Sequence, residues 1–486
     1  MQHFDLAVIG AGAGLIIMEG ALHAGQTCAV IEKGPIGGTC LNRGCIPSKM
    51  LVYPADLIRD AQRGGHVGVT YGAPDIDWDK ISRRMWRQIN VNKTLEESLK
   101  QTRGLTLFQG EARFEDAHTL SVSLNAGGNA IISASQIVVA AGTRTRIPPI
   151  PGLKDAGYVT SESFFGERFP KTLYESILII GGGSTACEFA HILSAFGTKV
   201  TMAVRSETIL RDFDEETGHF VSEELSRAGV RVLYFAAAQK VTREGDLKTM
   251  VFLDKKTGET YSVSAQEIFL ASGIVPNSDL LNIKAADIAA DSEGYIITDD
   301  RLNTNVPHIW ALGDINGKFP LRHKANYEAG ILNDHLFGEK KQRASYESVP
   351  KAVFTHPQAA GVGMSERAAR AAFGDRVRIA YNYYSDVVAG IAMGYSAKKP
   401  GNGFAKIICD DKRRILGAHV VGPQAAVLVQ PFAYLMNAGG LAQAATPATF
   451  DPIERSMVIH PSFSELTAWA LGNFIEPELG IPDENI

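Results

Sequence analysis

Two glycine-rich turns, each placed between an apolar strand and a helix, constrain the fold of this chain more than any other feature. The first, GAGAG at residues 10–14, follows the strand-like FDLAVI and opens the helical stretch LIIMEGALHAG. The second, GGGSTA at residues 181–186, follows SILII and opens CEFAHILSAFG. A strand, a glycine turn and a helix in this order begin a βαβ unit that binds a nucleotide. We therefore predict two nucleotide-binding units and two cofactors.

The first unit has the residues that a dinucleotide requires. Gly10 makes the turn, Gly12 lets the backbone approach a pyrophosphate, and Gly14 completes the motif at the helix start. Glu32 ends the second strand, where a carboxylate can bond a ribose hydroxyl. Leu15 stands where a third small residue usually allows the helix to pack closely on the strand, and we expect the fold to survive it.

The second unit differs at the end of its second strand. Its fingerprint consists of Gly181, Gly183 and Ala186. No acid follows at the place of Glu32; Arg205 and Arg211 lie there instead, where a 2′-phosphate needs cations. This favours NADPH over NADH. The alternative is that both are solvated surface arginines, because Glu207 is close enough to offset their charge.

The remaining strands suggest that the second unit is inserted into the first. The stretches QIVVAAGTRTRIP and EIFLASGIVPN each end in a glycine turn, and HIWALGDING returns the chain to the first domain. From about Tyr346, alternating strands followed by helices suggest a separate α+β domain. We predict an α/β protein with the domains 1–153 (first cofactor domain), 154–276 (inserted nicotinamide domain), 277–345 (return to the first domain) and 346–486 (C-terminal domain).

Composition is that of an ordinary globular enzyme. The 486 residues are 45% hydrophobic and 21% charged, with a formal net charge of −5, so a nucleic-acid partner is not expected. The N-terminus runs directly into a strand, with no signal-peptide pattern, and no apolar run is long enough to cross a bilayer. We expect a cytoplasmic protein without a membrane partner.

The segment CLNRGC at residues 40–45 holds two of only five cysteines. A regular helix would separate their Cα atoms by roughly 8 to 9 Å, whereas a disulfide needs about 4.4 to 6.8 Å. The segment must therefore bend, which Gly44 and Pro47 permit. A structural zinc site would show closer cysteine pairs, so a redox-active disulfide is the better interpretation and no metal is expected. The other three are expected to be small buried hydrophobes: Cys28, Cys187 and Cys409.

Disulfide chemistry also needs a group that moves thiol protons. His460, in IHPSFSE, is the leading candidate, and Glu465 can orient its ring and stabilise its cation. Alone this signal is weak, because the chain has 12 histidines.

Taken together, GGTCLNRGCIPSK, the two nucleotide units, ALGD and HPSFSE resemble the flavoprotein disulfide reductases, which include dihydrolipoamide dehydrogenase and glutathione, mycothione and mercuric reductases. The resemblance covers essentially the whole chain. It implies FAD in the first unit and NADP or NAD in the second, with Lys49 and Glu188 as an ion pair beside the flavin ring. The further cofactor contacts expected are Lys33, Gly38, Thr39, Ala112, Gly142, Thr143, Gly273, Gly313 and Asp314.

The resemblance also implies a mechanism and an assembly. A hydride passes between nicotinamide and flavin, and the Cys40–Cys45 disulfide exchanges electrons with the other face of the ring. Cys45 is the flavin-proximal thiol and Cys40 the interchange thiol. His460 and Glu465 reach the thiols of the other subunit, which implies a homodimer.

Several features bear on which member of the family the chain resembles. The arginines and the stretch LRHKANYEA are similar to glutathione or mycothione reductase, whereas LNRGCIPSK is similar to dihydrolipoamide dehydrogenase. Ile274, Arg322 and Val458 depart from the family pattern, and the segment before His460 is several residues longer than usual. We expect an NADPH-driven reductase of a small disulfide, with an NAD-dependent dihydrolipoamide dehydrogenase acting on a lipoyl group of a partner protein as the alternative. A one-cysteine oxidase and a flavin-bearing scaffold are the remaining rivals.

Overall fold

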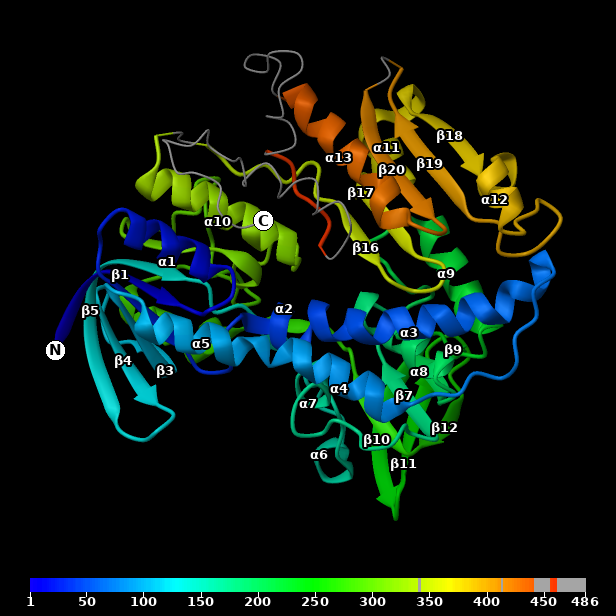
Figure 1. The fold of residues 1–486 in the computed structure, drawn as a ribbon, viewed down its shortest axis with the longest axis horizontal. Helices are drawn as coiled ribbons and strands as arrows, with labels where there is room; N and C mark the ends of the chain where they lie inside the picture. Colours follow the sequence, from blue (N-terminus) through cyan, green and yellow to red (C-terminus); the bar gives the residue numbers. More distant parts are fainter. Residues whose placement is uncertain (340–341, 412–413, 441–454, 461–486) are drawn as a thin grey trace, which may run out of the picture.

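The computed structural model describes residues 1–339, 342–411, 414–440 and 455–460 (Figure 1). It has mixed α/β architecture, with three sheets of four to six strands and two smaller ones. The prediction of an α/β fold with two nucleotide-binding domains and a further α+β domain is confirmed. No helix in the described ranges is both long enough and apolar enough to span a membrane.

The first domain is built on a six-stranded sheet. Five strands run parallel in the order β3-β2-β1-β5-β15, and β4 pairs antiparallel with the ends of β3 and β5. The helices α1 (Gly14–His23) and α10 (Arg322–Phe337) pack against each other over one face. The strands are β1 (Gln2–Ile9), β2 (Cys28–Glu32), β3 (Leu105–Phe114), β4 (Thr119–Leu124), β5 (Asn129–Val139) and β15 (Ile309–Ala311).

The chain leaves this sheet after β5 and returns to it at β15, which pairs with β5. The two segments that connect the domains pair with each other as a small antiparallel sheet, β6 (Thr143–Thr145) with β14 (Ile274–Pro276). This is the topology of an inserted domain, which the return strand in HIWALGDING predicted.

The inserted domain has its own parallel sheet in the order β13-β7-β8-β9, beside an antiparallel sheet β10-β11-β12. Its main helices are α8 (Ser184–Ala195) and α9 (Glu215–Arg227), with the short α6 (Leu153–Ala156) and α7 (Ser161–Phe164) before them. The strands are β7 (Ser176–Ile180), β8 (Lys199–Ala203), β9 (Arg231–Leu233), β10 (Ala236–Glu244), β11 (Leu247–Asp254), β12 (Thr260–Ala265) and β13 (Glu267–Leu270).

The C-terminal domain is a five-stranded antiparallel sheet in the order β16-β17-β20-β19-β18. The sequence predicted strands followed by helices in this part of the chain, and the structure has both. The strands are β16 (Lys351–Val353), β17 (Ala359–Gly363), β18 (Arg378–Tyr383), β19 (Phe404–Cys409) and β20 (Ile415–Val421), and the helices are α11 (Glu366–Phe373), α12 (Val388–Ala392) and α13 (Ala425–Gly440).

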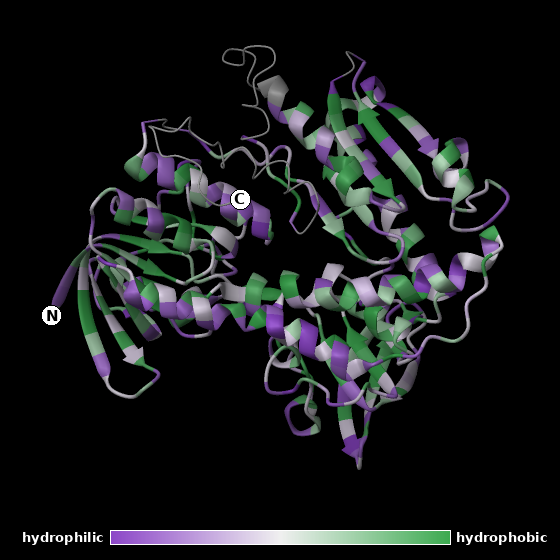
Figure 2. Cartoon of the chain, viewed as in Figure 1, coloured by the Kyte–Doolittle hydropathy of each residue, from purple (hydrophilic) through white to green (hydrophobic). Residues whose placement is uncertain are grey.

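A long helix connects the three domains. α3 (Cys45–Arg63) follows the short α2 (Gly38–Arg43) and runs through the middle of the molecule, with the inserted domain on one side and the C-terminal domain on the other (Figure 1). α4 (Trp78–Ile89) packs on α3, and α5 (Val91–Gln101) leads back to β3. One hydrophobic core joins residues of α3, α8, β16 and β20, and Figure 2 shows the apolar residues gathered in these elements. The N-terminal end of α3 is therefore held where all three domains meet.

Candidate active site

The two cysteines of CLNRGC lie on either side of a break between helices. Cys40 belongs to α2, and Cys45 is the first residue of α3. Gly44 between them has φ −135° and ψ −112°, which interrupts the helical path. Pro47 falls in the first turn of α3, where proline lacks no needed hydrogen bond. The bend that the spacing required is therefore present, and both residues are free thiols in the structure.

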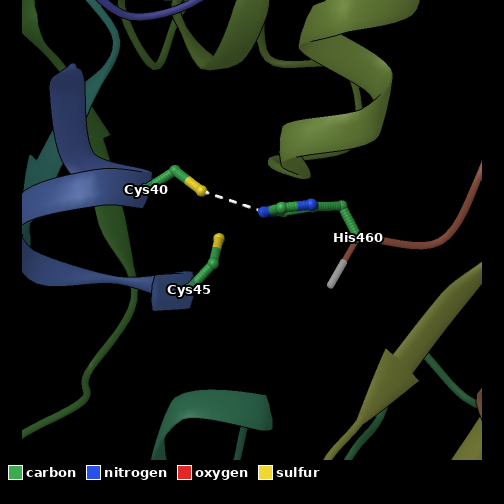
Figure 3. Close-up of side chains that lie close together, drawn as sticks. All are labelled: Cys40, Cys45 and His460. Carbon is green, nitrogen blue, oxygen red and sulfur yellow. Dashed lines mark hydrogen bonds between the residues drawn. The ribbon is translucent and has the colours of Figure 1, made fainter. Parts of the chain in front are cut away.

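The thiols meet an imidazole from the far end of the chain. Cys40 Sγ lies 3.3 Å from His460 Nε2, and the two sulfurs and the ring nitrogen all lie within 4.8 Å of one another (Figure 3). A ring nitrogen at this distance from a sulfur can take up or return the thiol proton. The sequence predicted these three residues as a group, and the fold brings them together.

Hydrogen bonds fix the segment that carries His460. The backbone N–H of His460 donates to His323 Nδ1 at 3.4 Å, and that of Ile459 donates to Gln430 Oε1 at 2.8 Å. His323, at the start of α10, pairs through Nε2 with the Pro350 carbonyl at 2.7 Å, and burial lowers its pKa to about 4. His323 is therefore neutral: its Nε2–H donates to Pro350, and its Nδ1 accepts from His460.

The resemblance implies that His460 reaches the thiols of the other subunit, and the subunit that supplies the imidazole stays a prediction. In the single chain that the structure describes, His460 lies beside Cys40. Gln430 on α13 and His323 on α10 hold the segment that carries His460. Glu465 lies outside the described residues.

The surroundings shift the pKa values of the two thiols in opposite directions. The hydrogen bond with Cys40 lowers the pKa of Cys45, and the positive charges of Lys49 and His460 add to this effect against burial. The same hydrogen bond, followed by burial, raises the pKa of Cys40. Cys45 is accordingly the thiolate of the reduced pair, and Cys40 carries the shared proton.

This division predicts the pH dependence of the reduced protein. The Cys45 thiolate should persist below the ordinary thiol pKa of about 8.5 and disappear only as the pH falls through its lowered pKa. Cys40→Ala removes the S–H donor, so the pKa of Cys45 should rise toward the ordinary value. Titration of the thiolate ultraviolet absorbance in both proteins measures this. An unchanged Cys45 pKa in the variant would contradict the hydrogen-bond assignment.

A salt bridge lies one helical turn after the dithiol. Lys49 Nζ on α3 is 2.7 Å from Glu188 Oε2 on α8, and the Glu188 side chain is 10% exposed. Glu188 Oε1 also accepts from the backbone N–H of Phe354 at 3.0 Å, and Lys49 lies 4.5 Å from the centre of the Phe354 ring. The pair thus links all three domains and brings a positive charge near Cys45.

The first glycine turn fits a bound dinucleotide. A Cβ on Gly10 would lie 2.4 Å from the Ala140 carbonyl oxygen, and one on Gly38 would lie 2.9 Å from Gly12 Cα, so these backbones approach too closely for side chains. Glu32 Oε2 accepts from the Ala11 N–H at 2.8 Å, which places the carboxylate at the mouth of the turn. The turn is at the carboxyl ends of parallel strands, where such folds bind nucleotides. The residues present therefore fit FAD.

Gly14 allows the close helix-to-strand packing that we expected from a small residue at position 15. A Cβ there would lie 2.6 Å from Val8 Cγ1, so Gly14 provides the close contact between helix and strand and Leu15 is half-buried beside it. The fold thereby tolerates the leucine.

The other predicted cofactor residues occupy varied positions. Thr143 Oγ1 is 3.4 Å from Asp314 Oδ2, and burial raises the pKa of Asp314. Lys33 and Thr39 are exposed, and Ala112 is buried in β3. Three glycines have positive φ at the ends of strands: Gly142, Gly273 and Gly313.

In the inserted domain the second glycine turn has the same design. Gly181 has φ +139°, and a Cβ on it would lie 2.1 Å from the Ala271 carbonyl oxygen. Gly183 is the N-cap of α8, and Ala186 is fully buried beneath it. Arg205 and Arg211 are both exposed, and within the described ranges neither pairs with Glu207.

The remaining cysteines have no part in this site. Cys28 and Cys187 are completely buried, and burial raises the pKa of Cys28 to about 12. Cys409 is half-buried in β19. Sequence reasoning missed His323 and Gln430: His323 was visible in LRHKAN but without a partner, and nothing local marks Gln430.

Two family models match the chain. Residues 4–329 match the pyridine nucleotide-disulphide oxidoreductases, and residues 349–471 match the dimerisation domain of the same family. The chain therefore belongs to the pyridine nucleotide-disulphide oxidoreductase family, whose members are FAD-dependent enzymes that use NAD(P)H and act on sulfur groups.

Its relatives cover nearly its whole length. Mycothione reductase of Mycobacterium tuberculosis is 31% identical over 90% of this chain and 94% of its own. Glutathione reductase of Nostoc sp. is 31% identical over 95% and 98%, and dihydrolipoyl dehydrogenase of Chlamydia muridarum is 27% identical over 99% of each. Among solved structures, the HOCl-induced flavoprotein disulfide reductase RclA from Escherichia coli matches with a TM-score of 0.77 and 26% identity, over 97% of this chain and 100% of that one.

Proposed function

We propose that the chain is a cytoplasmic, homodimeric, FAD-containing reductase that uses NADPH to reduce a low-molecular-weight disulfide. The observation that carries the proposal is the group formed by Cys45, Cys40 and His460, beside the Lys49–Glu188 pair and at the carboxyl edge of the first sheet. The homodimer rests on the dimerisation-domain match.

The chain's own residues account for the thiol chemistry. FAD, when bound, passes two electrons from the nicotinamide to the Cys40–Cys45 disulfide. With one proton, these leave a Cys40 thiol and a Cys45 thiolate, the distribution that the hydrogen bond between them favours. Lys49 stabilises that thiolate.

Reduction of the substrate RSSR then follows in two exchanges. His460 takes the Cys40 proton, and the Cys40 thiolate attacks one substrate sulfur to form a mixed disulfide. His460 then donates this proton to the departing RS⁻, which leaves as RSH. The Cys45 thiolate next attacks the Cys40 sulfur, which restores the Cys40–Cys45 disulfide and releases a second RS⁻ that gains a proton from water.

The nicotinamide preference follows from two exposed arginines. Replacing Arg205 and Arg211 together with alanine should raise the KM for NADPH about 10- to 100-fold, because two charge-assisted contacts to the 2′-phosphate are lost. The KM for NADH should stay within about twofold. Arg231→Ala, an exposed arginine on β9, is the matched control. A strong preference of the unaltered enzyme for NADH would favour the alternative, an NAD-dependent dihydrolipoamide dehydrogenase.

The substrate is tested directly. Turnover of glutathione disulfide, mycothiol disulfide and lipoamide, each with NADPH and with NADH, should show one small disulfide reduced efficiently with NADPH. The absence of turnover with every disulfide, in a protein that still reduces an artificial acceptor, would contradict the proposal.

A further inference from the structure

Arg322 is a departure from the family pattern that the mechanism above does not use. It is the first residue of α10, and its Nη1 lies 3.8 Å from the position that a Cβ on Gly12 would occupy. Gly12 is the turn residue where the backbone is open to a pyrophosphate. The guanidinium of Arg322 therefore reaches the mouth of the first glycine turn.

This guanidinium has no partner of its own in the described part of the chain: no hydrogen bond, ion pair or ring contact of its side chain is formed there. Arg322 is half-buried, and a guanidinium offers five N–H donors. Arg43 is paired with Glu162 and Arg144 with Asp279, whereas the half-buried Arg301 has no side-chain partner in the described residues. What distinguishes Arg322 is its place: an unpaired guanidinium at the mouth of a nucleotide-binding turn is available to a phosphate.

The elements around Arg322 also favour an anion. α10 has 16 residues, and its first turn contributes unpaired backbone N–H groups and the positive end of the helix dipole. The charge of Arg322 also acts on two nearby acidic groups. The hydrogen bond with Cys45 raises the pKa of Cys40, and burial raises the pKa of Asp314. The positive charge of Arg322 opposes both shifts.

We propose that Arg322 binds the pyrophosphate of FAD at the Gly12 turn, as a cofactor-positioning residue. The inference rests on the proposed function, because it takes FAD to be the dinucleotide of the first domain. Gly12 and Gly38 leave the backbone bare at this point, so the arginine supplies the side-chain charge that the glycines cannot. The contact fixes the phosphate end of the cofactor.

The test is a binding titration of the apoprotein, which needs no turnover. Apoproteins of the unaltered chain, Arg322→Met, Arg322→Lys and the exposed control Arg84→Met are titrated with FAD and, separately, with riboflavin, which lacks phosphate. Flavin fluorescence gives each Kd, at low and at high salt. Arg322→Met should weaken FAD binding about 10- to 100-fold and leave riboflavin binding unchanged. Arg322→Lys should retain part of the affinity, and salt should weaken FAD binding less in Arg322→Met than in the unaltered chain.

Two results would overturn the inference while leaving the proposed function in place. One is an unchanged FAD Kd in Arg322→Met, and the other is an equal loss of FAD and riboflavin affinity in that variant, since neither fits a phosphate contact. Failure of the unaltered apoprotein to bind FAD would instead overturn the proposed function, and this inference with it. Circular dichroism of each variant identifies misfolding. If Arg322→Met is misfolded, the FAD Kd of Arg322→Lys is compared with that of the unaltered chain, and an unchanged Kd would overturn the inference.

Discussion

Cys40→Ser should abolish reduction of the disulfide substrate, with a loss of at least about 10⁴-fold in kcat, because no other group can form the mixed disulfide. Reduction of an artificial electron acceptor by way of the flavin should continue, since Cys45 and the Lys49–Glu188 pair are unaltered. Steady-state assays with both acceptors measure the two activities.

The matched control is Cys409→Ser, which alters a half-buried cysteine in β19 away from the dithiol. This variant should keep both activities. Disulfide turnover that survives in Cys40→Ser would show that Cys40 is not the interchange thiol. Loss of both activities would show that serine disturbs the flavin site.

His460→Gln should lower kcat for disulfide reduction by about 10²- to 10⁴-fold, the range of a lost general acid–base. Glutamine keeps a polar side chain beside Cys40 but cannot carry the proton from the thiol to the departing RS⁻. Reduction of the flavin by NADPH should be unaffected. His66→Gln, at an exposed histidine in the short 3₁₀ helix after α3, is the control.

A mixed dimer identifies the chain that supplies the imidazole. One subunit carries Cys40→Ser and the other His460→Gln. The resemblance implies that His460 acts on the thiols of the other subunit, so one site of this dimer keeps all its groups and about half the normal rate is expected. Loss of nearly all disulfide turnover would show instead that the imidazole acts on the dithiol of its own chain, beside which it lies in the structure.

Local sequence patterns predicted the elements that build the site. The glycine turns at 10–14 and 181–186 specify a strand, a tight turn and a helix within about 30 residues, and the structure has both units. The break at Gly44 could also be predicted, because two cysteines five residues apart on an unbroken helix would be too distant for a disulfide. These inferences depend on backbone conformation over short distances.

The parts that could not be predicted depend on contacts between remote segments. His460 is 420 residues from Cys40 in the sequence, and its place is set by Gln430 and His323 in two other helices. No spacing in the sequence encodes that packing, and so the two side chains that hold the His460 segment were not foreseen. The side-chain direction of Arg322 is similar: the sequence marked the residue as unusual, and only the fold placed its guanidinium at Gly12.

The central claim is that electrons pass through a reversible bond between Cys40 and Cys45. Peptide mass spectrometry after alkylation, on the flavin-loaded protein before and after one equivalent of NADPH under anaerobic conditions, tests it most directly. We predict a peptide with the 40–45 disulfide before NADPH, and alkylation of both cysteines afterwards. Two cysteines that are alkylated equally before and after NADPH, in an enzyme that still reduces its disulfide substrate, would contradict the account.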